Sequence, residues 1–363
     1  MERRGSEKSA PERRRAGIFA GLRAALGIDW FDFENKVVVV TGGSRGLGLV
    51  LSRRLARMGA RVAILARDEG SLERAREDIR RRGGTVITGR CDVRDRAQVQ
   101  AAIRTITQEL GPIDVLINNA GVIQVGPMET MTQEDYDDAM RTHFWGPLHT
   151  TLAVLPEMRR QGRGRIVNIS SFGGKAAVPH LLPYSASKFA LVGLSEGLRA
   201  ELSKHGIVVT TVCPGLMRTG SVYNAFFKGK HREELTWFAL AASMPLFTIS
   251  AERAASMILF ATRLGRAEVM LGWPAKLGAW VHGLFPGLTS DVLGLADRFL
   301  PEPNGIGTRR ARGRDSQTRL SSSFLTALTQ RAARAYNQLG EPTQIGGAQP
   351  GPGQSIDTSP RDE

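Results

Sequence analysis

The sequence predicts an α/β fold built on one doubly wound parallel sheet with helices on both faces. Short β-branched runs alternate with stretches of helical apolar spacing from residue 36 to about residue 300, a pattern typical of a parallel sheet covered on both sides. A glycine-rich turn joins the first run to the first helical stretch, which marks a tight strand-to-helix connection. The hydrophobic fraction of 42% is sufficient for one large core.

Each expected strand is a short apolar run that ends at a turn or a polar residue, and these runs cover 37–40, 61–65, 85–88, 115–117, 165–169 and 208–212. The helices expected between them cover 47–58, 71–82, 96–109, 133–151 and 185–204. Because strand–helix–strand connections are right-handed, this order predicts a Rossmann-type sheet whose ligand crevice lies at the carboxyl ends of the strands. We assign this single domain to residues 36–300, between an extension at 1–35 and a tail at 301–363.

The region after residue 215 has no strand period. Aromatic and apolar side chains crowd residues 220–250, so we expect a lid over the substrate end of the sheet. Helical patterns are expected from 251 to 300. The tail at 301–363 is rich in Gly, Pro, Ser, Gln and Arg and is expected to be mostly disordered, apart from a short helix around 325–339.

Both ends and the overall charge limit the classes of function. Residues 18–30 have amphipathic helical spacing beside basic residues, so this basic extension either lies on a membrane surface or packs on the flank of the domain. The net charge of +14 falls largely on the tails and the predicted helices, without an aromatic-interleaved basic stripe, so no nucleic-acid partner is expected.

The cysteines and the apolar runs indicate a cytoplasmic location. Cys91 and Cys213 can form no disulfide framework and have no metal-ligand spacing, so we expect a reducing compartment and no metal. No run reaches the ~18 apolar residues of a spanning helix, and no cleavage site follows the N-terminal apolar stretch, so we expect no secretion.

The glycine-rich turn has the composition of a pyrophosphate-binding loop. A strand precedes it and a helix follows it, which is the context in which glycines allow a tight turn and a close approach of the backbone to a pyrophosphate. The residues expected to bind the cofactor here are Thr41, Gly42, Ser44, Arg45, Gly46, Leu47 and Gly48.

The end of the second strand favours NADP over NAD. An acidic residue about 20 residues beyond the glycines would bind the ribose 2′-hydroxyl of NAD, but this chain has Ala66 and then Arg67 at that point. Arg45 and Arg67 can pair with the 2′-phosphate of NADP through charge-assisted hydrogen bonds. The alternative is that both arginines are ordinary surface residues.

Tyr184 and Lys188 stand four residues apart at the start of a predicted helix, so they share one face. A nearby ammonium favours the phenolate form of tyrosine, which makes the pair a candidate acid/base unit. The pair is one of several motifs between residues 36 and 219, which are Thr41 to Gly48, Asp92, Asn118-Asn119-Ala120-Gly121, Ser171, Tyr184, Lys188 and Pro214-Gly215 through Thr219. With these motifs in this order, the chain resembles the short-chain dehydrogenases/reductases in their compact single-domain branch.

This resemblance implies a role for each matched residue. Tyr184 would protonate the carbonyl oxygen in reduction, Lys188 would bind the nicotinamide ribose and lower the tyrosine pKa, and Ser171, rather than Ser170, would bind the substrate oxygen. Asp92 and Val93 would border the adenine. The remaining cofactor contacts would come from Asn118, Asn119, Ala120, Gly121, Pro214, Gly215 and, at the carboxamide, Thr219.

One position departs from the family pattern. His143 stands where the resemblance leads us to expect an Asn that orders a water in the proton relay to the lysine. His143 either preserves that water, joins the relay through its imidazole, or is a buried histidine with satisfied hydrogen bonds.

The resemblance implies an NADP(H)-dependent oxidoreductase that interconverts a carbonyl and an alcohol, and the apolar lid suggests a lipophilic substrate. Two alternatives are a reductase of acyl groups on an acidic carrier protein and a catalytically silent, cofactor-binding regulator or scaffold. The family usually pairs subunits through helices 133–151 and 185–204, so a homo-oligomer is expected. The apolar stretch 273–288 either touches a membrane surface peripherally or packs against protein.

Overall fold

The computed structural model of the protein describes residues 30–244, 247–321 and 323–339. Its centre is a parallel sheet of seven strands in the order β11-β7-β6-β4-β1-β2-β3. The strands are β1 (Val37–Thr41), β2 (Arg61–Ala66), β3 (Val86–Arg90), β4 (Val115–Asn118), β6 (Gly164–Ile169), β7 (Ile207–Pro214) and β11 (Glu268–Leu271). The strand order reverses between β1 and β4, where such sheets open a ligand crevice. The predicted fold class is confirmed.

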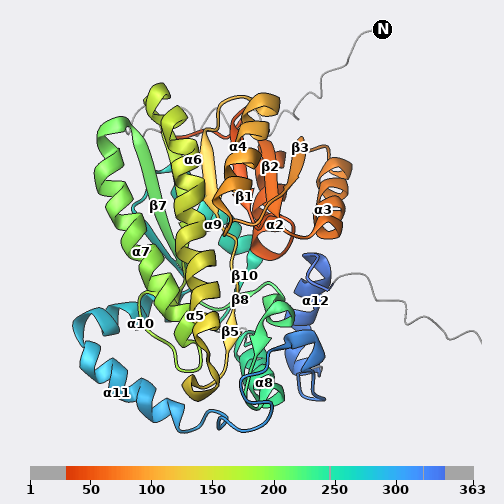
Figure 1. Ribbon diagram of the computed structural model, residues 1–363, viewed down its shortest axis with the longest axis vertical. Coiled ribbons are helices and arrows are strands. Elements are labelled where there is room, and N and C mark those ends of the chain that lie inside the picture. The colour runs from red at the N-terminus through yellow and green to blue at the C-terminus, as the bar shows by residue number, and fades with distance from the viewer. Residues whose placement is uncertain (1–29, 245–246, 322, 340–363) are drawn as a thin grey trace, which may run out of the picture.

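Helices cover the sheet on two faces. One face carries α2 (Gly46–Arg57), α3 (Glu69–Arg81) and α9 (Ala251–Arg263), and the other carries α4 (Arg96–Leu110), α6 (Gly146–Gln161) and α7 (Leu182–Leu202). Figure 1 shows α6 and α7 in front of the sheet. Successive residues of a strand point to opposite faces, so Val38 and Val40 pack in the first core while Val37 and Val39 pack in the second.

Two expected helical regions are interrupted. The stretch 133–151 divides into α5 (Gln133–Met140), a π-helical turn (Arg141–Trp145) and α6. The helical patterns expected from 251 to 300 are interrupted by β11, which pairs with β7 and completes the sheet. A strand of four residues is too short to show a period of its own, so only its pairing partner defines it.

The aromatic region 220–250 folds into short elements at the carboxyl ends of the strands. They are η5 (Ser221–Asn224), β9 (Phe226–Phe227), α8 (His231–Ala241) and β10 (Ile249–Ser250), with residues 245–246 outside the described part. Two small sheets hold them, because β9 pairs with β5 (Gln124–Val125) and β12 (Ala311–Arg312), and β10 pairs with β8 (Met217–Arg218). Their apolar side chains form a third core cluster, against which the ring of Tyr184 packs.

The prediction that the tail is mostly disordered is wrong for its described residues up to Leu339. This part includes β12, two 3-10 turns and α12 (Ala327–Ala335). A buried ion cluster anchors it, in which the Asp135 carboxylate binds Lys228 and accepts a hydrogen bond from Arg310 at 2.8 Å. Composition could not show this, because the partners of Arg310 lie far away in the sequence. Residues 340–363 lie outside the described part.

The predicted helical stretch after β11 forms the hairpin of α10 (Trp273–Leu284) and α11 (Pro286–Asp297). Ala275 is the one buried residue of α10, and α11 has none. Figure 1 shows this hairpin beside the bottom of α7, extending away from the sheet. Among the described residues, no helix combines the length and the apolar character needed to cross a membrane. The amphipathic stretch expected at 18–30 lies outside the described residues except for Trp30, whose ring packs edge-on against Phe260.

Candidate active site

The glycine loop between β1 and α2 needs glycine at particular positions. Gly42 and Gly46 have φ values of 63° and 55°, which side chains disfavour. A Cβ on Gly48 would lie 2.2 Å from the carbonyl oxygen of Gly42, so α2 begins in direct contact with the loop. A glycine loop that leads directly into a helix N-terminus is a common binding site for a phosphate group.

The end of β4 holds the loop from the other side of the switch point. The Thr41 hydroxyl accepts hydrogen bonds from the backbone N–H groups of Asn119 at 3.0 Å and Ala120 at 3.1 Å. The Asn119 side chain donates to the carbonyl of Thr41 at 3.0 Å. Asn118 instead points into the sheet, where it donates to Asn168 at 2.9 Å and accepts from Thr150 at 2.6 Å.

Arginines gather beside this loop. Burial lowers the pKa of Arg45, and the charges of Arg67, Arg312 and Arg314 lower it further, so these four guanidinium groups lie within electrostatic reach of one another. Such a concentration of positive charge suits a phosphate. The sequence predicted Arg45 and Arg67; Arg312 and Arg314 were missed because they lie in the tail, within no motif.

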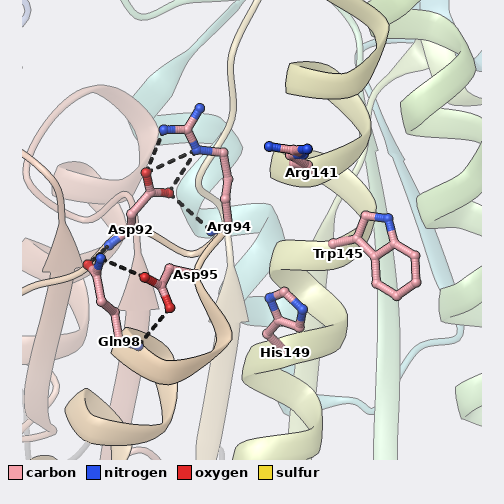
Figure 2. A pocket seen from close by; sticks show the side chains of 7 residues that line it. All are labelled: Asp92, Arg94, Asp95, Gln98, Arg141, Trp145 and His149. Atoms are coloured by element: carbon pink, nitrogen blue, oxygen red, sulfur yellow. Dashed lines mark hydrogen bonds and ion pairs between the residues drawn. The ribbon is translucent and has the colours of Figure 1, made fainter. Parts of the chain in front are cut away.

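Asp92 follows β3 at the edge of the crevice, and its carboxylate is bound by Arg94 at 2.6 Å. Burial would raise the pKa of Asp92, but hydrogen bonds from Arg94 and the charge of Arg67 lower it overall. Val93 is buried beside it and its carbonyl lies 3.2 Å from the His149 ring. Figure 2 shows the adjoining cavity of about 510 Å³, whose walls are Asp92, Arg94, Asp95 and Gln98 on one side and Arg141, Trp145 and His149 on the other.

Pro214, Gly215 and Thr219 lie at the end of β7 and just after it. Pro214 ends β7, and the Gly215 N–H donates to Leu271 of β11 at 2.9 Å. Thr219 is buried, and its Cβ would lie 4.0 Å from a Cβ placed on Gly46. The structure therefore brings the predicted cofactor residues of β1, β4 and β7 together at one crevice.

Tyr184 and Lys188 occupy the first two turns of α7, with the ammonium 5.7 Å from the centre of the tyrosine ring. Lys188 is 4% exposed, and its ammonium donates to the carbonyl of Ile169 at 2.8 Å. Burial lowers the pKa of Lys188 to about 7. The ammonium and the neutral amine are therefore both populated near neutral pH.

The pKa of Tyr184 is raised, which differs from the sequence expectation. Burial raises this pKa, and the hydrogen bond with Ser171 opposes the shift without reversing it. We expected Lys188 to lower it, but the loss of hydration of the partly buried side chain is the larger effect. Tyr184 consequently keeps its proton at neutral pH.

The two serines after β6 have different partners. Ser171 caps the 3-10 turn Phe172–Gly174, accepts the Gly173 N–H at 3.1 Å and hydrogen-bonds with Tyr184. Ser170 is turned away and donates to the carbonyl of Lys188 at 3.0 Å. The structure thus brings Ser171 to the tyrosine and assigns Ser170 to the packing of α7.

His143 lies in the π-helical turn and is 1% exposed. Its Nε2 accepts the Val122 N–H at 3.1 Å, so Nδ1 carries the proton and donates to the Ser187 hydroxyl at 2.7 Å. Ser187 in turn donates to the backbone carbonyl of Tyr184 at 2.8 Å. Burial lowers the pKa of His143 well below its usual value, and the charge of Lys188 adds to this. Both ring nitrogens are used, and the imidazole is neutral.

Polar contacts that the sequence did not indicate connect the segment before Tyr184 to the lid. His180 Nδ1 lies 2.7 Å from Glu234 of α8, and its Nε2 lies 3.5 Å from Asp297 of α11. Glu234 also accepts a hydrogen bond from Trp237 at 2.7 Å. No spacing pattern joins these residues, so sequence reasoning had no signal for them.

Residues of the C-terminal region also contact the crevice and were missed. The Gly46 N–H donates to the carbonyl of Tyr336 at 2.8 Å, and the Asn337 side chain donates to the carbonyl of Ser44 at 3.0 Å. These residues lie in a stretch that was expected to be at most a short helix in a disordered tail.

Known proteins are similar to this chain in sequence. The sequence profile of the short chain dehydrogenases matches residues 36–227. A putative ketoacyl reductase of Streptomyces coelicolor is 39% identical over 188 residues, which are 51% of this chain and 72% of the relative. The putative oxidoreductase SadH of Mycobacterium tuberculosis is 34% identical over 246 residues, which are 67% of this chain and 88% of the relative.

Solved structures of similar fold belong to dehydrogenases and reductases. A gluconate 5-dehydrogenase from Burkholderia cenocepacia, in complex with NADP and tartrate, superposes with a TM-score of 0.60 at 26% identity, covering 69% of this chain and 98% of that one. The F189W variant of the actinorhodin polyketide ketoreductase, solved with NADPH, superposes with a TM-score of 0.59 at 32% identity. The match covers 65% of this chain and 96% of that one. The chain therefore belongs to the short chain dehydrogenase family and is an oxidoreductase.

Proposed function

We propose that the protein is an NADPH-dependent reductase of a lipophilic carbonyl compound, with Tyr184 as the general acid. The observation that carries this proposal is the placement of Tyr184, which hydrogen-bonds with Ser171 and has the Lys188 ammonium 5.7 Å from the centre of its ring; its pKa is raised, so the hydroxyl keeps its proton. A protonated tyrosine is the form that reduction of a carbonyl consumes, because the developing alkoxide must receive a proton.

The side chains divide the work around the substrate oxygen. Ser171 and Tyr184 donate hydrogen bonds to that oxygen, which orients the carbonyl and stabilises the charge that develops on it. Tyr184 then transfers its proton, and the nearby Lys188 ammonium stabilises the phenolate that remains. NADPH, when bound along the glycine loop and the ends of β4 and β7, supplies the hydride. His143 is a positioning residue, since it acts on Tyr184 through Ser187.

The cofactor preference for NADPH rests on Arg45, Arg67 and the absence of an acidic residue at Ala66, the end of β2. The relatives solved with NADP and NADPH support the same choice. We expect Arg67→Asp to weaken NADPH binding and to strengthen NADH binding, because a carboxylate repels the 2′-phosphate and binds the 2′-hydroxyl. Equal effects on both cofactors in fluorescence titrations would refute this role.

The lipophilic substrate is supported by the third core cluster, which includes Tyr223, Phe227 and Phe238 and packs against Tyr184. The test is NADPH oxidation by purified protein across lipophilic ketones and aldehydes, with Tyr184→Phe as the matched variant. We expect the variant to bind NADPH as the natural chain does while turnover falls by about 10²–10⁴-fold. Cofactor binding without turnover of any carbonyl would instead favour the silent regulator.

A reductase of carrier-bound acyl groups is the second candidate, and the putative ketoacyl reductases among the relatives favour it. Acyl thioesters of a small carrier protein and of a short synthetic thiol belong in the same screen. A large preference for the carrier-bound form, lost at high salt, would support this candidate, because a basic surface attracts an acidic carrier electrostatically.

We also propose that the protein forms a homo-oligomer through α5, α6 and α7. Trp145, Leu152 and Phe189 support this, because these large apolar side chains on the π-helical turn, α6 and α7 are 46%, 47% and 40% exposed. Light scattering of the natural chain and of Phe189→Glu tests it. A monomer in both would rule out this interface.

The location we propose is cytoplasmic, with peripheral contact between the α10–α11 hairpin and a lipid surface. Free buried thiols at Cys91 and Cys213 support the reducing compartment. Trp280, Leu284 and Leu288 are 65%, 72% and 59% exposed, and residues 277–290 contain no Asp, Glu, Lys or Arg, which favours an interfacial position. Flotation with phosphatidylcholine vesicles should carry the natural chain and lose Trp280→Ser/Leu284→Ser; equal flotation would contradict the proposal.

A further inference from the structure

The glycine loop is covered by residues 336–338 of the chain itself. The Gly46 N–H, at the start of α2, donates to the Tyr336 carbonyl at 2.8 Å. A Cβ on Gly46 would lie 2.4 Å from the Nε2 of Gln338, so the Gln338 carboxamide rests on the bare α-carbon of this glycine. Ser44, Gly46 and Leu47 are all buried.

Several contacts hold this cover in place. Asn337 follows α12 with a φ of 56°, a left-handed conformation that Asn tolerates and that ends the helix. Its side chain donates to the carbonyls of Ser44 at 3.0 Å and Ser71 at 3.1 Å, and its oxygen accepts from Arg74 at 2.8 Å. Tyr336 is buried, and its hydroxyl donates to Glu252. The cover is therefore a folded part of the protein.

The cover also engages an arginine that we assign to the cofactor phosphate. Asn224 donates to the backbone carbonyl of Gln338 at 2.8 Å and to its side-chain oxygen at 2.7 Å. The other end of the Asn224 amide accepts a hydrogen bond from Arg45 at 3.0 Å. Arg45 is thus linked to Gln338 through one intervening side chain.

A dinucleotide needs the same glycine and the same backbone N–H groups. Its pyrophosphate approaches the middle glycine of the loop and accepts hydrogen bonds from N–H groups at the helix N-terminus. Here the Gly46 N–H already has an acceptor, and Gln338 fills the space above its α-carbon. The pyrophosphate and residues 336–338 cannot occupy that space together.

We propose that residues 336–338 are an internal competitor of the cofactor, which occupies the pyrophosphate site in the free protein and leaves it when NADPH binds. This inference rests on the proposed function, namely that the chain binds NADPH at its glycine loop. The apparent affinity for NADPH is then reduced by the fraction of molecules in which the cover is closed. Any partner or modification that opens the cover activates the enzyme.

The first test compares NADPH dissociation constants of three full-length chains by fluorescence titration. The variant Asn337→Ala/Gln338→Ala loses four side-chain hydrogen bonds, three at Asn337 and one at Gln338. Each contributes roughly 2- to 13-fold to an equilibrium constant. We expect it to bind NADPH at least about tenfold more tightly than the natural chain. Gln330→Ala is the matched control, because Gln330 lies on α12 and bonds only within the C-terminal region, to Ser323 and Thr326. Its affinity should equal that of the natural chain.

Hydrogen exchange provides a readout that a purely structural role would not change. In the free natural chain the Gly46 amide should exchange slowly, and in the double variant it should exchange faster. Addition of NADPH should accelerate exchange in residues 336–339 of the natural chain. Slower exchange there with NADPH, or unchanged or weaker NADPH binding by the double variant, overturns the competition while leaving NADPH binding established. Absence of NADPH binding in all three chains would remove the proposed function, and the competition with it.

Discussion

The two ends of the cofactor crevice are assembled over very different distances along the chain. At the catalytic end, Ser170 and Lys188 are 18 residues apart in one strand–helix unit that also carries Ser171 and Tyr184. At the glycine-loop end, the contact between Ser44 and Asn337 joins residues 293 positions apart. A local unit can be recognised from motif spacing, whereas a distant cover depends on how the whole tail packs. The predictions that follow separate these two kinds of construction.

The largest effect is expected where the C-terminal region is anchored. Asp135 is fully buried and binds Lys228 and Arg310, so Asp135→Asn takes the carboxylate from the buried Lys228 ammonium and leaves Arg310 with the longer ion pair to Asp138 at 3.9 Å. Breaking a buried ion pair costs about 3–5 kcal/mol of unfolding free energy. Denaturant unfolding should show this loss for Asp135→Asn and almost none for the neighbouring Asp137→Asn, which is exposed. Equal stability of both variants would show that the cluster does not anchor the tail.

At the catalytic end, the adjacent serines form a matched pair. Ser171→Ala removes a donor to the substrate oxygen, so kcat should fall by about 10²–10³-fold. Ser170→Ala removes one buried hydrogen bond to the Lys188 carbonyl and should cost about 1 kcal/mol of stability with little change in kcat. If steady-state kinetics gave the reverse order, the assignment of the two serines would be wrong.

At the glycine-loop end, Gly48→Ala places a Cβ 2.2 Å from the Gly42 carbonyl. Backbone atoms must move to admit it, at a cost of about 1–3 kcal/mol of stability, and NADPH binding should weaken because the loop opens. Gly197→Ala on α7 has open space around its Cβ and should stabilise the helix by about 0.5–1 kcal/mol. Thermal unfolding and NADPH titration of the two variants check these expectations. Undiminished stability and NADPH affinity in Gly48→Ala, or a loss of stability in Gly197→Ala, would contradict them.

The most gradual effect is a pH dependence at Lys188. Its pKa falls from 10.5 to about 7 on burial, so between these values the unfolded chain binds the extra proton. Stability should therefore rise with pH by up to about 1.4 kcal/mol per unit from this group. Burial raises the pKa of Cys91 from 9.0 to about 11 and that of Cys213 to about 12. Above pH 9 the folded chain therefore holds protons that the unfolded chain loses, which opposes the trend. The window for measuring the Lys188 effect is thus pH 7 to 9.

Lys188→Met should remove this slope. Lys175→Met is the control, because the pKa of Lys175 is raised by Glu268 and Glu196 despite its burial and the residue stays charged throughout the window. The measurement is the midpoint of urea unfolding at several pH values. A slope that persists in Lys188→Met would mean that another group carries it.

Several features were readable from the sequence because their physical basis is local. The alternation in Val37–Thr41, the glycines of the loop and the four-residue spacing of Tyr184 and Lys188 are set by backbone geometry within a few residues. That geometry is the same wherever the segment occurs, so fold class and family followed from motif order. The short-chain dehydrogenase assignment is confirmed by the family match over residues 36–227.

The tertiary structure alone decided what lies opposite these motifs. β11 is a strand because β7 lies beside it. Burial raises the pKa of Tyr184, and burial together with the charge of Lys188 keeps His143 neutral. The cover of Gly46 by Tyr336 and Gln338 belongs to the same class. Burial and hydrogen-bond partners depend on contacts between residues far apart in the chain, and composition and spacing carry no record of those contacts.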